Sequence, residues 1–223
     1  MFFRKDYAKP GPGVRPDEPE KTGWRRFVEI LTLESSSLLK LNWLFLLSCI
    51  PVVTIPVALY AMHIVVRRIV CDEIVDCFYH YKTAFRENWK KAYIAFFTVA
   101  LPFIAAGYGI IVYLRFATVN PIFFLPFSFC STIFLITSLS STYFYAILSA
   151  GKTIREALRL SIVLGIGKPS RALLAALGAY GLTFAAVLAF PISLPYFLLI
   201  GFSIPCLLAN FFVRTVVKQY CSL

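Results

Sequence analysis

The stretch LNWLFLLSCIPVVTIPVALY, from Leu41 to Tyr60, decides the fold class of this chain. Between Leu38 and Val66 the only formal charge is on Lys40, and about 20 apolar residues suffice to cross the hydrocarbon core of a bilayer. The stretch therefore predicts a membrane protein. Because proline lacks the N–H that a helix interior needs, Pro51 and Pro56 should bend or break the helix within this run.

Composition supports this prediction for the whole chain. Of its 223 residues, 59% are hydrophobic and only 15% are charged, which is too apolar for a water-soluble globule of this size. The net charge of +11 agrees with basic residues that flank membrane spans, so we expect membrane lipid and not nucleic acid around the protein. The six cysteines form no CxxC pair, so we expect free thiols, no metal and no cofactor.

Four further apolar segments are each long enough to cross a membrane. They are Ala92 to Leu114, Pro121 to Ala150, Ala172 to Phe190 and Ile192 to Val213. With the first run they predict an all-α integral membrane protein of about five transmembrane helices, the first one broken by proline. We divide the chain into a polar leader (1–22), an amphipathic interfacial helix (23–40) and a helical transmembrane domain (41–223).

Basic residues gather in two of the connections, 67–91 and 151–171, whereas the connections near Asn120 and Pro191 contain only Arg115. Cytoplasmic loops retain Lys and Arg, so both basic loops and the C-terminus should be cytoplasmic. A first run that crosses once would place the N-terminus outside. The alternative is that the run enters and returns, with its turn near Pro51 to Pro56; we favour the single crossing, which gives five spans.

The basic loops carry amphipathic patterns. Phe85 and Trp89 recur at four-residue spacing opposite Arg86 and Lys90, and Thr153 to Val163 repeats the pattern more weakly. Such helices either tether the loops to lipid headgroups or form a docking surface for a partner. The candidate structural and docking residues are Asn42, Pro51, Thr54, Pro56, Phe85, Arg86, Asn88, Trp89, Lys90, Arg155 and Arg159.

Motifs for catalysis and energy coupling are missing from the sequence. GIGK at Gly165 to Lys168 lacks the spacing and the hydroxyl of a nucleotide-binding loop. His63 is the one ionisable side chain inside the apolar runs, and we interpret it as an interfacial residue. Hydroxyl residues from Ser128 to Thr142 indicate helix packing, or else a polar conduit. We expect no enzyme activity.

The Leu-Asn start and Pro-Val-Val-Thr centre of Asn42 to Tyr60, followed by AFRENWKKA at Ala84 to Ala92, resemble the YesL-like family of bacterial membrane proteins. The leader KPGPGVRPDEPEK at Lys9 to Lys21 is similar to that of one subgroup, whereas Pro56 stands where the family usually has glycine. The resemblance implies the bacterial cytoplasmic membrane and an accessory, non-enzymatic subunit that joins the permease subunits of a carbohydrate importer of the ATP-binding cassette type. The alternative function is a small channel or facilitator that acts on its own.

Overall fold

The computed structural model describes residues 23–71, 73–118 and 120–221, with side chains as far as Arg214. Within these residues it contains helices and no strand. The α-helices are α1 (Trp24–Leu33), α2 (Ser35–Ser48), α3 (Ile55–Val70), α4 (Cys77–Glu87), α5 (Trp89–Ala117), α6 (Phe124–Ser149), α7 (Ile154–Gly167), α8 (Pro169–Ala176), α9 (Leu182–Leu188), α10 (Leu194–Leu199) and α11 (Ser203–Cys221). Two short 3₁₀ helices, η1 (Val52–Thr54) and η2 (Pro121–Phe123), precede α3 and α6, and a π-helical turn, η3 (Leu177–Gly181), joins α8 to α9.

The predicted all-α membrane architecture is confirmed. Four stretches of the described chain are long and apolar enough to span a bilayer, and the pair α1–α2, bent by 72°, is a fifth candidate. The four stretches are Val52–Val70, Trp89–Ala117, Pro121–Ser149 and Pro169–Leu188. α3 is central because its side chains enter both hydrophobic clusters of the core, one with α1, α2 and α4 and the other with α5, α6 and α7.

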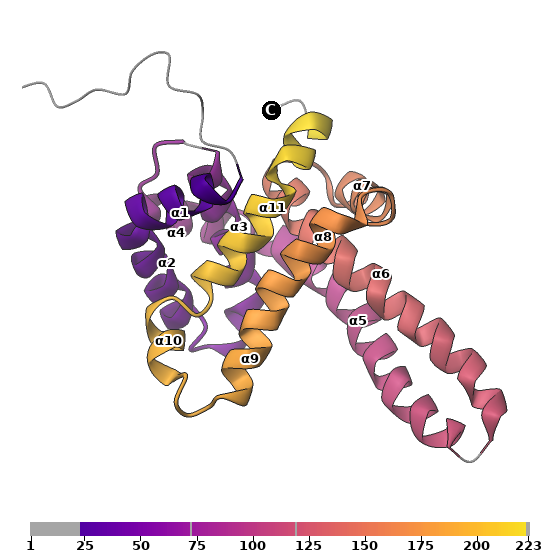
Figure 1. Cartoon of the computed structure of the whole chain (residues 1–223). Coiled ribbons are helices and arrows are strands. Elements are labelled where there is room, and N and C mark those ends of the chain that lie inside the picture. Colours follow the sequence, from indigo (N-terminus) through magenta and orange to yellow (C-terminus); the bar gives the residue numbers. More distant parts are fainter. Residues whose placement is uncertain (1–22, 72, 119, 222–223) are drawn as a thin grey trace, which may run out of the picture.

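The first apolar run folds as two helices, which fits a run that enters and returns better than the single crossing that we favoured from the sequence. α2 ends at Ser48 and α3 begins at Ile55. Figure 1 shows α2 running down to the turn and α3 returning beside it. Pro51 lies in the turn, whereas Pro56 is the second residue of α3, where the missing N–H costs no helical hydrogen bond. Pro56 therefore starts a helix and does not break one.

Three other predicted boundaries differ from the structure. The helix expected over 23–40 ends at Leu33, and the chain bends before α2. The amphipathic pattern that contains Phe85 and Trp89 is divided at Asn88 into α4 and the start of α5. The last apolar segment, 192–213, is not one continuous helix, because α10 stops at Leu199 and α11 starts at Ser203.

The charged residues lie almost entirely at one end of the molecule. α1, α4, α7 and the C-terminal half of α11 share the upper end in Figure 1, and α2 and α5 have their first turns there. Among the described basic residues only Arg115, in the last turn of α5, belongs to the opposite end. α5 and α6 extend from the body as a hairpin (Figure 1), and only 11% and 6% of their apolar windows are buried. Their exposed apolar surface is what lipid would cover.

α6 and α7 approach closely where Gly165 meets Ser140. A Cβ at Gly165 would lie 2.8 Å from Ser140 Oγ and 3.4 Å from Ser140 Cα. Ser140 Oγ is itself buried without a hydrogen-bond partner. The glycine therefore allows a helix contact that a methyl group would push apart.

Gly165→Ala should lower the free energy of unfolding by about 1–3 kcal/mol, because overpacking forces the two helices to separate. Adding Ser140→Ala should recover most of this loss, since the nearest clashing atom is then absent. Thermal unfolding in detergent measures both variants. Gly167→Ala, with no atom within 4 Å of the added Cβ, is the control; equal losses in Gly165→Ala and Gly167→Ala would contradict the packing argument.

The return of the first run predicts that α1 and α4 lie on the same side of the membrane. In a chain whose six cysteines are replaced, single cysteines at Thr32 and Lys82 should react alike with a membrane-impermeant maleimide on intact cells. A cysteine at Arg115 should give the opposite result. Labelling that is alike at Thr32 and Arg115 would restore the single crossing.

Candidate functional site

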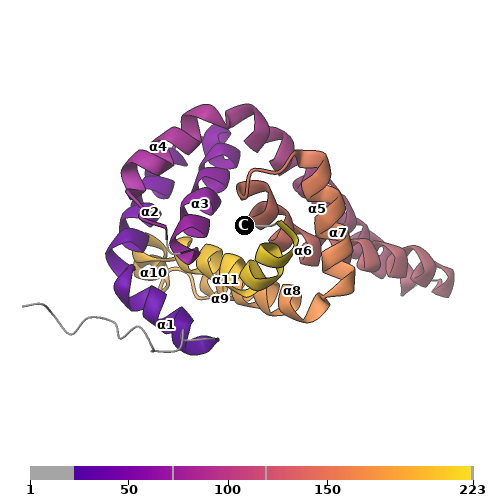
Figure 2. The ribbon, with the colours of Figure 1, turned by 90° about the horizontal axis from the view of Figure 1, so that it is seen from above.

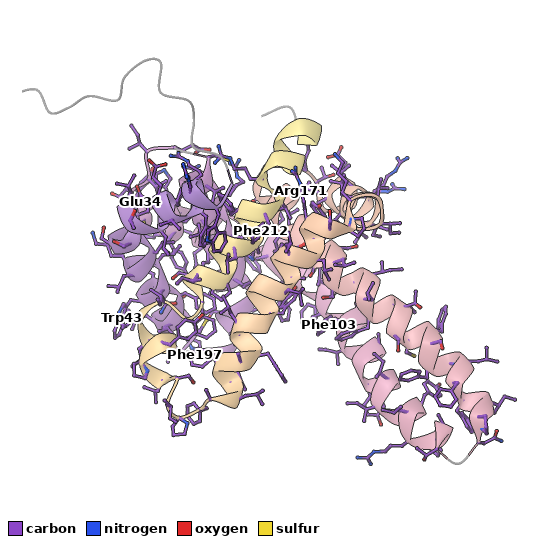
Figure 3. All side chains as sticks on the ribbon, in the orientation of Figure 1. Glu34, Trp43, Phe103, Arg171, Phe197 and Phe212 are labelled. Atoms are coloured by element: carbon purple, nitrogen blue, oxygen red, sulfur yellow. The ribbon has the colours of Figure 1, made fainter. Side chains whose placement is uncertain are left out.

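Asn42 closes the break between α10 and α11. Its side chain is fully buried, and its Nδ2 donates to the carbonyl oxygens of Phe197 (2.9 Å) and Leu198 (3.0 Å). Its Oδ1 accepts from the backbone N–H groups of Phe202 (3.0 Å) and Ser203 (3.3 Å). Figure 3 labels Trp43 on α2 and Phe197 on α10, the helices that this contact joins. The amide thus satisfies the last carbonyls of one helix and the first N–H groups of the next.

The candidate residues of the first turn cap α2. Thr54 Oγ1 donates to the carbonyl oxygens of Ser48 and Pro51, and the Thr54 backbone N–H also donates to Pro51 (2.9 Å). The Val53 carbonyl accepts from Tyr93 Oη on α5 at 2.6 Å. Pro51, Thr54 and Pro56 therefore build a tight helical turn, which is a structural role.

The residues around the start of α5 divide into buried and exposed ones. Phe85 packs against both core clusters, and Asn88 Nδ2 donates to the Ala84 carbonyl at 3.2 Å. Arg86, Trp89 and Lys90 are exposed, and Lys90 Nζ lies 5.3 Å from the centre of the Trp89 ring. The exposed three are thus available to a headgroup or a partner.

α7 presents Arg155 and Arg159 to the outside, one turn apart. Its first turn is held by a capping box, in which the Glu156 N–H donates to Thr153 Oγ1 (3.4 Å) and the Thr153 N–H donates to Glu156 Oε2 (3.2 Å). The backbone N–H of Thr153, and then its hydroxyl, hold the pKa of the Glu156 carboxyl below its usual value. The one acidic group in this turn therefore remains ionised and capped at neutral pH.

The start of α5 is tied to the connection that leads into α7. Lys91 Nζ donates to the Lys152 carbonyl at 2.9 Å, and α5 and α7 lie on the same side of the molecule when seen from the charged end (Figure 2). We call Arg86, Lys90, Arg155 and Arg159 the basic surface. Within the part of the chain that the structure describes, none of these four forms an ion pair.

The interpretation of His63 as an interfacial residue is wrong, because α6 and α11 bury it. Its Nδ1 accepts from Asn210 Nδ2 at 3.0 Å, which leaves the ring proton on Nε2. The ring also stacks on Tyr145, with centroids 4.9 Å apart. Asn210 donates a second bond to the Cys206 carbonyl (2.8 Å), while its Oδ1 is buried without a partner. Sequence periodicity could not identify this contact, because its members are more than 60 residues apart.

Hydroxyl groups along the lower part of α6 bond to their own helix. Ser128, Ser131 and Thr132 donate to the carbonyls of Phe124, Phe127 and Ser128. This hairpin extends away from the other helices (Figure 1), so no ring of helices surrounds these groups. The arrangement favours the packing interpretation over the polar conduit.

One comparison with known proteins found that part of this chain is similar to a family. Residues 38–113 match a family model described as a protein of unknown function, DUF624. We call these matched residues the DUF624 domain. The domain runs from α2 to most of α5 and includes every candidate residue except Arg155 and Arg159. No curated protein and no solved structure matches the chain.

Asn42 joins the DUF624 domain to the C-terminal helices, since all four of its partners lie outside residues 38–113. Asn42→Ala should therefore lower the free energy of unfolding by about 2–5 kcal/mol, because four backbone groups lose their partner in apolar surroundings. Thermal unfolding in detergent measures the loss.

Asn120→Ala is the matched control for this prediction. Asn120 is exposed and its Oδ1 accepts one bond, from the Ile122 N–H at 3.1 Å, so its loss should cost about 1 kcal/mol or less. Equal effects of the two substitutions would show that Asn42 does not hold the helix break.

Proposed function

We propose that this protein is a non-enzymatic accessory membrane subunit that associates with the permease subunits of a carbohydrate importer of the ATP-binding cassette type, and stabilises or regulates them. The YesL-like resemblance of Asn42 to Tyr60 and of Ala84 to Ala92 supports this assignment, and both stretches lie inside the DUF624 domain. The protein would reside in the bacterial cytoplasmic membrane, with its charged end in the cytoplasm, as the asymmetry of Lys and Arg favours.

The observation that carries the proposal is the basic surface. Arg86, Lys90, Arg155 and Arg159 are exposed and have no ion pair among the described residues. Rim charges of this kind steer association with an oppositely charged partner and set its specificity. An acidic cytoplasmic face of a permease subunit is the partner chemistry that fits.

The alternative is a channel or facilitator that acts alone. It would need a polar path between helices, and the hydroxyls of Ser128, Ser131 and Thr132 are instead bonded to their own backbone. Flux of small sugars through liposomes that contain only the purified chain would favour this alternative over an accessory role.

The accessory role predicts that the tagged chain, extracted in mild detergent, brings down permease subunits of a sugar importer. Arg155→Glu/Arg159→Glu should reduce that recovery about tenfold, because two attractive contacts become repulsive. Quantitative mass spectrometry of the captured chains measures the change. Since both side chains are exposed and unpaired, folding should be unaffected.

Arg115→Glu is the control, because it places a reversed charge at the opposite end of the molecule. It should leave recovery unchanged. A tagged chain that is purified without any permease subunit, together with sugar uptake that is unaffected by deletion of the gene, would defeat the proposal.

A further inference from the structure

Two adjacent arginines at the end of α3 share one carboxylate. Arg67 Nη2 lies 3.7 Å from Glu73 Oε1, and Arg68 Nε lies 3.7 Å from Glu73 Oε2. Both separations exceed the usual hydrogen-bond length of about 3.2 Å or less. The backbone N–H of Glu73 donates to the Arg68 carbonyl at 3.1 Å, which holds Glu73 beside the pair. Among the described residues, Glu73 is therefore the acidic group that pairs with both arginines, and it makes no direct hydrogen bond to either guanidinium group.

Both guanidinium groups also have an N–H donor without an acceptor among the described residues. Nε of Arg67 and Nε of Arg68 are both buried and have no hydrogen-bond partner among the residues that the structure describes. The Arg67 side chain is only 17% exposed and that of Arg68 is 34% exposed. A shielded guanidinium with unpaired N–H groups is costly unless an anion accepts from it. This distinguishes the pair from the exposed arginines of the basic surface.

The position of the pair suits a lipid headgroup. Arg67 and Arg68 occupy the last turn of α3, at the charged end of the molecule, where the apolar span stops. Exposed aromatic side chains occur on the neighbouring elements of this end: Phe78 and Tyr79 on α4 and Trp89 at the start of α5. Aromatic residues of this kind are enriched at the level of the headgroups.

We propose that Arg67 and Arg68 bind the phosphate group of an anionic phospholipid headgroup. Each guanidinium group can donate two parallel hydrogen bonds to a pair of phosphate oxygens. Basic sites between helices on the cytoplasmic side of a membrane are known to bind anionic headgroups. The Glu73 carboxylate lies beside the same two guanidinium groups, so it competes with the phosphate for them. The site is separate from the basic surface, so it does not depend on the accessory role.

Lipid binding to the full-length chain, purified in detergent and titrated with phosphatidylglycerol, tests the site by native mass spectrometry. Arg67→Gln/Arg68→Gln should weaken binding about tenfold or more, as expected for the loss of charge-assisted hydrogen bonds. Lys82→Gln/Arg171→Gln removes the same charge from exposed positions at the same end and should leave binding within about twofold. Equal weakening by both double variants would show a diffuse electrostatic effect and overturn the proposal.

Glu73→Gln gives a prediction of the opposite sign, which a folding defect cannot imitate. Removal of the competing carboxylate should strengthen phosphatidylglycerol binding several-fold. If the three residues form only a structural ion pair, Glu73→Gln will lower the unfolding temperature without any gain in lipid binding, and the site is then refuted. Arg68→Gln alone, at the more exposed arginine, should weaken binding if the double variant does not fold.

Two further titrations identify the source of the phosphate. Phosphatidylcholine should bind more weakly than phosphatidylglycerol, and the arginine variants should not change its binding. Inorganic phosphate at millimolar concentration should compete only weakly with the lipid, because it lacks the acyl chains that hold a headgroup at this depth. Stabilisation by inorganic phosphate, with no response to phosphatidylglycerol, would overturn the lipid assignment.

Discussion

Every backbone N–H and C=O inside a bilayer must find a hydrogen-bond partner within the protein. The side-chain amide of Asn42 is the partner of four such backbone groups at the break between α10 and α11. α10 could not stop at Leu199 and α11 could not start at Ser203 in apolar surroundings without such a residue. Gly201 makes the corner possible, because a Cβ there would lie 2.5 Å from the Phe197 Cα. One side chain of α2 therefore determines how the last helices return toward the charged end, and it couples the DUF624 domain to a part of the chain outside it.

The turn between α2 and α3 obeys the same constraint by other means. Thr54 satisfies the carbonyl of Ser48 with its hydroxyl, and Tyr93 satisfies that of Val53 from a neighbouring helix. Pro56 needs no partner for a missing N–H at the start of α3. The turn thus ends one helix and begins the next, and the chain returns to the end that it left. This return helps to keep the described charges at one end, and only Arg115 lies at the far end of a helix that runs away from it.

Local sequence information predicted the elements but not their long-range partners. The apolar run from Leu41 to Tyr60 and its prolines indicated both a membrane helix and its interruption, and charge asymmetry indicated the shared end of the loops. The two topologies considered for this run differ only in tertiary contacts, so economy of crossings favoured the single crossing, whereas the two-helix structure fits the returning run better. The break at Gly201 and the burial of His63 were also missed. Each depends on a partner about 150 residues distant, Asn42 with Phe197 and His63 with Asn210, and periodicity reports only neighbours within a few turns.

The basic residues of the charged end differ in the desolvation cost of their charges, and this difference separates their roles. Arg86, Lys90, Arg155 and Arg159 remain in contact with solvent, so their charges require no compensation and serve orientation or association. The Nε atoms of Arg67 and Arg68 are shielded from solvent, and the carboxylate of Glu73, their one acidic partner among the described residues, forms no hydrogen bond with either arginine. A glutamine at either position would fill similar space without the desolvation penalty of an unpaired charge. An anion that enters at headgroup level would pair with both guanidinium groups and would anchor the end of α3, a helix whose side chains enter both hydrophobic clusters of the core.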